Sequence, residues 1–149
     1  MKNIFINFVV VQHDCMKLIS LHGTDDRLYE LVARLVMSPE VLRYNNNYPF
    51  KTTPQHCWHI CITNGEVVGF MPVKTTRGGL SLDNYYIRDD NSEIIDALLN
   101  HILDNSDKPV TALSHKRHTD IFRRHGFITS TVFAQYNRMQ FIPGKGDSD

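Results

Sequence analysis

The fold of this chain is decided by the stretch Ser114-His115-Lys116-Arg117-His118-Thr119-Asp120-Ile121-Phe122-Arg123-Arg124-His125-Gly126-Phe127. Within it, a helical spacing of three and four residues relates Ile121, Phe122 and His125. Gly126 follows, and glycine readily takes the left-handed conformation that ends a helix. The next residues favour a β-strand: Phe127, Ile128, Thr131, Val132, Phe133 and Tyr136. The stretch therefore predicts a short helix that ends at a glycine and leads into a last strand, ending near Phe141.

Outward from this stretch, apolar patterns and turn signals predict the remaining elements. The predicted strands are Ile4–Val11, Met16–Leu21, Cys57–Thr63, Glu66–Lys74, Leu80–Ile87 and Pro109–Leu113. The predicted helices are one that starts after Thr24-Asp25-Asp26, a short one at Pro39–Tyr44, and one from Asn91 or Ser92 to Leu103. The order is therefore β-(β)-α-(α)-β-β-β-α-β-α-β, which predicts an α+β fold.

Length and composition predict one ordinary globular domain spanning residues 1–149, with an extra N-terminal strand in 1–15 and a flexible tail in 143–149. The formal net charge is zero, with 16 basic and 16 acidic residues, which argues against bulk attraction to nucleic acid or an anionic membrane. Three cysteines do not make a disulfide framework and favour a cytoplasmic location. The apolar run Ile4–Val11 is too short to span a bilayer, so we expect no membrane segment there.

The order of elements, the strand Gly65-Glu66-Val67-Val68-Gly69-Phe70 and the Gly126-Phe127 junction together resemble the GNAT superfamily of N-acetyltransferases, over roughly Met16 to Phe141. The resemblance implies a mixed central sheet, with antiparallel N-terminal strands followed by a β-α-β-α-β C-terminal half. It also implies transfer of an acetyl group from acetyl-CoA to a small-molecule or protein amine, without a metal.

The chain departs from this family at the coenzyme-binding loop. The family places Arg/Gln-x-x-Gly-x-Gly/Ala there, so that backbone N–H groups bind the pyrophosphate. Here the connection after Ile87 is about two residues shorter, and Glu93 and Ile95 stand where small residues are expected. Asp89 and Asp90 add like charge, at a cost on the order of 1–4 kcal/mol per contact, against about 0.3–1 kcal/mol gained from the helix dipole. Repulsion outweighs attraction unless Arg88 or the basic helix intervenes.

Candidate site residues follow from the same resemblance. The family's general acid is a tyrosine four residues before the Gly-Phe junction, a position held by Phe122, and His115 replaces an asparagine that touches the cofactor. The candidates for catalysis are Asp83 as a base, and Tyr85 and Tyr136 as substitutes for the lost acid. The candidates for cofactor binding are Tyr86, Ile87, Arg88, Ser92, His115 and Phe122.

A second interpretation is a non-catalytic module, similar to the small GNAT-like proteins of bacteriophages, including internal virion proteins. Its partner would be a virion or host protein, and its location the host cytoplasm or the virion. An open groove at Ile87–Ile95 would favour the enzyme, and a groove filled by Ile94 or Ile95 the module. A third interpretation has a GNAT-type site modify a nucleobase or another phosphate-bearing acceptor held by the basic helix.

Two other patterns suggest ligands less strongly. Cys57, His59 and Cys61 share one face of a predicted strand, but same-face neighbours lie about 6.6 Å apart, too far for zinc ligands without partners from elsewhere. The segment from His115 to His125 carries four Lys or Arg and three His, whereas that from Asp89 to Asp107 carries six acids and no Lys or Arg. A solvated helix face is the simplest explanation of the basic segment, and we expect neither a metal nor nucleic acid to be bound.

Overall fold

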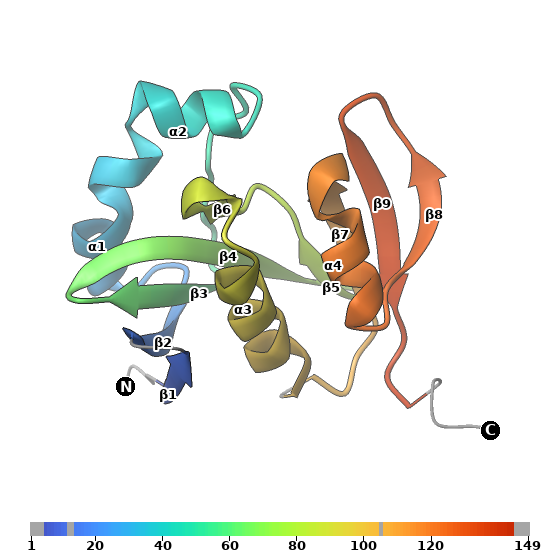
Figure 1. Ribbon diagram of the computed structural model, residues 1–149, viewed down its shortest axis with the longest axis horizontal. Helices are drawn as coiled ribbons and strands as arrows, with labels where there is room; N and C mark the ends of the chain where they lie inside the picture. Colours follow the sequence, from blue (N-terminus) through green and yellow to red (C-terminus); the bar gives the residue numbers. More distant parts are fainter. Residues whose placement is uncertain (1–4, 12–13, 105, 145–149) are drawn as a thin grey trace.

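The chain forms one mixed sheet flanked by helices (Figure 1). The computed structural model describes residues 5–11, 14–104 and 106–144. The strands are β1 (Phe5–Val11), β2 (Asp14–His22), β3 (His56–Thr63), β4 (Glu66–Thr76), β5 (Gly79–Leu82), β6 (Tyr86–Ile87), β7 (Val110–His115), β8 (Ile128–Val132) and β9 (Tyr136–Phe141). The helices are α1 (Asp26–Val36), α2 (Pro39–Tyr44), α3 (Ser92–Asp104) and α4 (Thr119–Arg124). Among the described residues, no helix is long and apolar enough to cross a membrane.

Strand order in the sheet is β1-β2-β3-β4-β5-β7-β9-β8, with β6 pairing to β4 beyond the end of β5. Neighbouring strands are antiparallel except for β5 and β7, which run parallel through Leu82 and Ala112. The predicted α+β class and mixed sheet are thereby confirmed. Of the predicted tail, residues 145–149 lie outside the described part of the chain.

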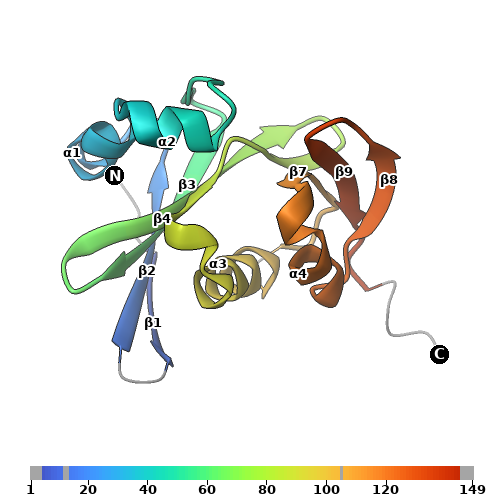
Figure 2. The same ribbon diagram turned by 45° about the horizontal axis from the view of Figure 1, so that its top comes forward.

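The two faces of the sheet are covered by different helix pairs (Figure 2). Side chains alternate between the faces along each strand, so Leu18 of β2 belongs to the core under α3 and α4, and Ile19 to the core under α1. The α3 side buries Ile95, Leu98 and Leu99 completely. These two cores fix the sheet between the helices.

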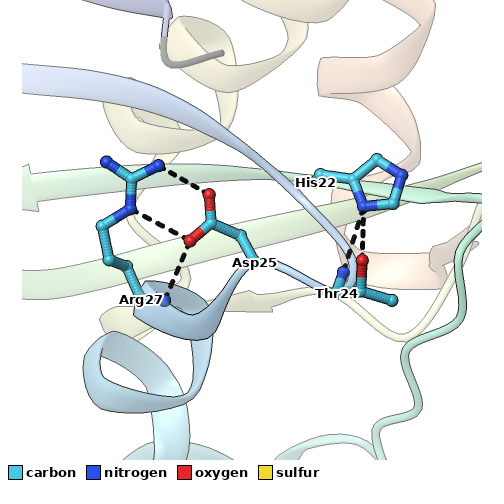
Figure 3. Close-up of polar contacts among 4 residues, drawn as sticks. All are labelled: His22, Thr24, Asp25 and Arg27. Carbon is cyan, nitrogen blue, oxygen red and sulfur yellow. Dashed lines mark hydrogen bonds and ion pairs between the residues drawn. The ribbon is translucent and has the colours of Figure 1, made fainter. Parts of the chain in front are cut away.

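Helix α1 begins at a capping carboxylate, as the Thr24-Asp25-Asp26 signal predicts. Asp25 accepts a hydrogen bond from the backbone N–H of Arg27 at 2.9 Å, and its carboxylate also binds the Arg27 guanidinium, with Oδ2 to Nη2 at 2.6 Å (Figure 3). The neighbouring His22 and Thr24 form a separate hydrogen-bonded pair. The cap satisfies N–H groups that the helix itself leaves unpaired.

The strand expected at Leu80–Ile87 is interrupted, and its prediction as one continuous strand is wrong. Strand β5 stops at Leu82, and β6 starts only at Tyr86. Between them Asn84 is left-handed, with φ of 54°, a conformation that asparagine tolerates better than most residues. Beyond Leu82 the chain pairs only with β4, while β7 continues to His115 beside β9. The two halves of the sheet therefore separate at this point.

The stretch that opened the sequence analysis folds partly as predicted. Gly126 is left-handed, with φ of 95°, and ends the helix as expected. The helix itself is shorter, because Ser114 and His115 complete β7 and a 3-10 turn at 116–118 precedes α4. The single last strand was wrong: residues 128–141 form the hairpin of β8 and β9. Its turn, Phe133-Ala134-Gln135, contains none of the usual turn residues, so no sequence signal marked it.

Candidate active site

The candidate site lies where β6 and β7 separate, on the line that divides the two halves of the sheet. Tyr85, directly before β6, is only 1% exposed and fills the space between the separating strands. Its hydroxyl accepts a hydrogen bond from the backbone N–H of His115 at 3.0 Å and bonds His118 Nδ1 at 2.7 Å. Its ring also packs 5.9 Å from that of Phe122 on α4, measured between centroids. One tyrosine thus connects β6, β7 and α4.

A carboxylate extends this chain of hydrogen bonds to the protein surface. Asp90, in the 3-10 turn Arg88–Asp90 before α3, bonds His118 Nε2 at 2.8 Å and accepts from Arg117 Nε at 2.9 Å. The Arg117 guanidinium also lies over the ring of Tyr44, 4.9 Å from its centroid. The turn before α3 and the turn before α4 are therefore bound to each other across the site.

The protonation states in this chain follow from burial and from Asp90. Burial raises the pKa of the Asp90 carboxyl, but the hydrogen bonds from Arg117 and His118 outweigh it, and the net shift is downwards. Burial lowers the pKa of His118, against the opposing effect of Asp90. A neutral His118 beside an ionised Asp90 carries its hydrogen on Nε2, so Nδ1 accepts from the Tyr85 hydroxyl. Burial also raises the pKa of Tyr85 well above its usual value, which keeps that hydroxyl protonated.

Buried polar atoms without hydrogen-bond partners gather around the same place. Among the described residues, such atoms at this junction are Tyr44 Oη, Asn45 Oδ1, His115 Nε2 and Asn137 Oδ1. The His115 ring lies 5.1 Å from that of Tyr44 and 4.8 Å from that of Tyr136, between centroids. Burial, followed by the charges of Arg117 and His118, lowers the pKa of His115 to about 3. An unpaired polar atom in the interior is costly, so these atoms are candidates for contacts with a ligand.

A pocket of about 510 Å³ borders this junction. It is lined by Tyr48, Asp83, Asn84, Leu113, Phe133, Ala134, Gln135, Tyr136 and Arg138. Its lining combines aromatic rings with one carboxylate and one guanidinium, and the Arg138 guanidinium lies 5.3 Å from the centroid of the Phe133 ring. The Tyr136 hydroxyl accepts a hydrogen bond from Asn46 Nδ2 at 2.8 Å, which ties the end of α2 to the start of β9.

No known family model and no curated protein sequence matches this chain. Solved structures do. An acyl-CoA N-acyltransferase from Pseudomonas aeruginosa has 15% identity over 83% of this chain and 98% of its own, with a TM-score of 0.66. The GNAT domain of S. lividans PAT has 12% identity over 91% and 96%, with a TM-score of 0.60. The PaiA N-acetyltransferase from Thermoplasma acidophilum, solved in complex with coenzyme A, has 15% identity over 79% of both chains, with a TM-score of 0.52.

The chain has the GNAT acetyltransferase fold. Within the GNAT fold, the structure brings Tyr85, His115 and Phe122 together at the separating strands. Two further candidates, Asp83 and Tyr136, line the adjacent pocket. Tyr85, His115 and Phe122 therefore lie on the buried side of the junction, and Asp83 and Tyr136 lie on the side that opens into the pocket.

The other candidates for cofactor binding lie apart from the buried hydroxyl of Tyr85. Tyr86 faces the opposite side of the sheet, against Phe70, and Ile87 is completely buried in the core under α3. Arg88 pairs with Glu66 at 3.2 Å rather than with the acids beside it. Ser92 is exposed at the first turn of α3.

The groove expected at Ile87–Ile95 is not open, and the space between the separating strands is not filled by Ile94 or Ile95. Ile94 and Ile95 are buried, and Ile94 packs against Gly69 of β4. The space between the separating strands is filled instead by Tyr85.

Sequence reasoning missed the role of the segregated charges. The acidic and basic segments face each other, through ion pairs of Asp90 with Arg117 and of Asp96 with Arg124 and His125. The spacing of opposite charges on consecutive elements was the available signal, but it did not specify the partners. Tyr44 and Asn45 at the end of α2 carried no signal at all.

The face of β3 considered for zinc holds a different cluster. The Ser20 hydroxyl bonds His59 Nδ1 at 2.9 Å and His101 Nε2 at 2.8 Å. Cys57 and Cys61 are free thiols, and burial raises the pKa of Cys61 to about 11. Within the described part of the chain, no three His, Cys, Asp or Glu side chains are placed to hold a metal ion.

Proposed function

We propose that this protein is an acyl-CoA-dependent N-acyltransferase of the GNAT type. The observation that carries the proposal is the separation of β6 from β7 with the protonated hydroxyl of Tyr85 held between them. Phe122 holds the position of the family's acid and cannot donate a proton. Tyr85 supplies a hydroxyl from the facing strand, next to that phenylalanine. The similarity to solved acyltransferases supports the same reading of the fold.

The residues at the separating strands suit the pantetheine part of the coenzyme. That part carries amide groups, and the buried, unpaired His115 Nε2 is a polar partner for them. His115 also stands at the position where the family touches its cofactor. Tyr85 fills the space in this structure, so its side chain must move when the coenzyme binds.

The residues before α3 suit the diphosphate part only after a rearrangement. Asp89, Asp90 and Glu93 place carboxylates near this helix start, and like charge there repels a diphosphate. Arg117 already pairs with Asp90 and His118 donates a hydrogen bond to it, so the basic segment does intervene, whereas Arg88 binds Glu66. Release of Asp90 would leave Arg117 free to bind a phosphate.

Acetyl-CoA, when bound, supplies the acetyl group as an activated thioester. Asp83 lines the pocket, and there it would hold an ammonium group and take its proton, which leaves a neutral amine to attack the carbonyl carbon. His118 orients the Tyr85 hydroxyl in this structure, and once the coenzyme has displaced the side chain, Tyr85 Oη would supply the proton for the departing thiolate. Tyr136 is the second hydroxyl at the junction and lines the pocket with Asp83.

Isothermal titration of the protein with acetyl-CoA tests the proposal. We expect saturable binding below about 1 mM, within the usual range of substrate affinities. His115→Phe keeps a ring of similar size but removes Nε2, and should weaken binding about tenfold, the worth of one hydrogen bond. Tyr29→Phe on α1, far from the junction, serves as the matched control and should change nothing. Absence of binding at this concentration rejects the enzymatic function.

The second candidate function is a non-catalytic binding module, and the filled space between β6 and β7 favours it. A virion or host-protein partner follows only from the resemblance to phage proteins. Co-purification with such a partner, together with no affinity for acetyl-CoA, would establish the module instead.

A further inference from the structure

The carboxylate of Asp90 is bound as a free anion would be. Two nitrogen donors from a different element, Arg117 Nε and His118 Nε2, lie 2.9 and 2.8 Å from its two oxygens. One of them belongs to a side chain that is only 2% exposed. Hydrogen bonds of this kind to an ionised group are stronger than those between neutral groups.

From this geometry we propose that Arg117 and His118, together with the Tyr44 hydroxyl, form a phosphate-binding site that Asp90 occupies as an internal substitute. The Arg117 guanidinium is held over the Tyr44 ring, 4.9 Å from its centroid, so the site keeps its shape without the carboxylate. Tyr44 Oη is buried and forms no hydrogen bond of ordinary geometry with a described residue, but it lies near enough to the Asp90 carboxyl to help lower the pKa of that group. A phosphate or diphosphate group has at least three unbridged oxygens, against two in a carboxylate, and this hydroxyl is a donor available for the third.

The backbone that carries Asp90 is held in an unfavourable conformation. Asp89 and Asp90 are both left-handed, with φ of 55° and 51°, and two consecutive residues other than glycine rarely are. Such strain persists where surrounding contacts impose it. For Asp89 the structure shows no side-chain hydrogen bond or ion pair with another described residue, so the turn is held by the contacts of the Asp90 carboxylate and by the hydrogen bond from Asn91 N–H to the Arg88 carbonyl. A phosphate that replaces the carboxylate removes the side-chain part of this restraint.

The ligand class is a phosphate or diphosphate group. Its source is either the coenzyme of the proposed function, on which this part of the inference rests, or a phosphate on another molecule. A phosphate that replaces the Asp90 carboxylate takes over its hydrogen bond with His118 Nε2, while His118 Nδ1 keeps its hydrogen bond with the Tyr85 hydroxyl. The phosphate would therefore be linked through His118 to the side chain that fills the space between β6 and β7.

Binding of inorganic pyrophosphate, measured by titration calorimetry, tests the site in the full chain. Asp90→Asn removes the competing charge and retains a residue that tolerates the left-handed conformation. Asp89→Asn makes the same charge change at the adjacent left-handed residue, and is the matched control. We expect Asp90→Asn to bind pyrophosphate at least about tenfold more tightly than the wild type, with Asp89→Asn within about threefold of it. Adding Arg117→Gln to Asp90→Asn should abolish the gain.

Equal gains in Asp90→Asn and Asp89→Asn would show a bulk charge effect and overturn the site, as would no gain in either. Asp90→Gly, which also suits the left-handed backbone, replaces Asp90→Asn if the latter does not fold. Acetyl-CoA titrated into the same variants separates this inference from the proposed function. Tighter pyrophosphate binding without any acetyl-CoA binding upholds the site and rejects the enzyme. If the wild type binds acetyl-CoA but Asp90→Asn does not bind pyrophosphate more tightly than the wild type, the phosphate site is rejected and the proposed enzyme is upheld.

Discussion

Tyr85→Phe removes one hydroxyl from the centre of the molecule and leaves the aromatic ring in place. The hydroxyl accepts from the His115 backbone N–H and donates to His118 Nδ1, so its loss leaves two polar groups without their partner. The ring is 1% exposed, and water does not readily replace the lost bonds. Each unsatisfied buried group costs about 1–3 kcal/mol. We therefore expect the free energy of unfolding to fall by about 2–6 kcal/mol, a large share of the roughly 5–15 kcal/mol typical of a domain.

Urea unfolding followed by the fluorescence of Trp58, which is buried, measures this loss. Tyr29→Phe is the matched control, because its ring is 65% exposed and its hydroxyl bonds, among the described residues, the sulfur of Met37. A surface change of this kind should stay within about 0.5 kcal/mol of the wild type. If Tyr85→Phe is as stable as Tyr29→Phe, Tyr85 does not hold β6, β7 and α4 together, and the account of the site is wrong.

Two further predictions concern packing and pH. Gly69→Ala would place a Cβ 2.9 Å from Ile94 Cγ2, so it should lower the free energy of unfolding by about 1–3 kcal/mol. Gly78→Ala is the control and should not lower it, because the space around Gly78 is open. Equal stability of the two variants would contradict the packing of α3 on β4. Burial above all lowers the pKa of His59 and of His115 to about 3, so the unfolded state binds more protons than the folded state below pH 6.5. The stability that these two neutral histidines contribute is complete above about pH 6.5. It falls towards pH 3 by up to about 1.4 kcal/mol per pH unit for each histidine. Equal free energies of unfolding at pH 7 and pH 5 would refute this.

The sequence predicted most of the elements because their patterns are local. Apolar spacing located α1 and α3, and Asn64-Gly65 located the hairpin of β3 and β4. The break between β5 and β6 had a signal in Asp83-Asn84, which are turn-forming residues, but the apolar run on either side outweighed it. The hairpin of β8 and β9 had none, since tertiary pairing alone imposes its turn.

The site was harder to predict because it depends on distances between elements. The sequence showed the acids before α3 and the bases before α4 as segregated charges, and it left open only that the basic helix intervenes at the coenzyme loop. It could not show that Asp90 reaches both Arg117 and His118, since this needs two left-handed residues in a row. Tyr85 was one of several tyrosines considered as the acid, and only the fold places its ring beside that of Phe122.

The most direct test of the central claim is the release of free coenzyme thiol from acetyl-CoA in the presence of small amines and amine-bearing peptides. The account predicts release that depends on the amine and that falls at least about a hundredfold in folded Tyr85→Phe, the usual contribution of a general acid. Release that does not depend on an amine, or that is equally fast in Tyr85→Phe, would contradict it.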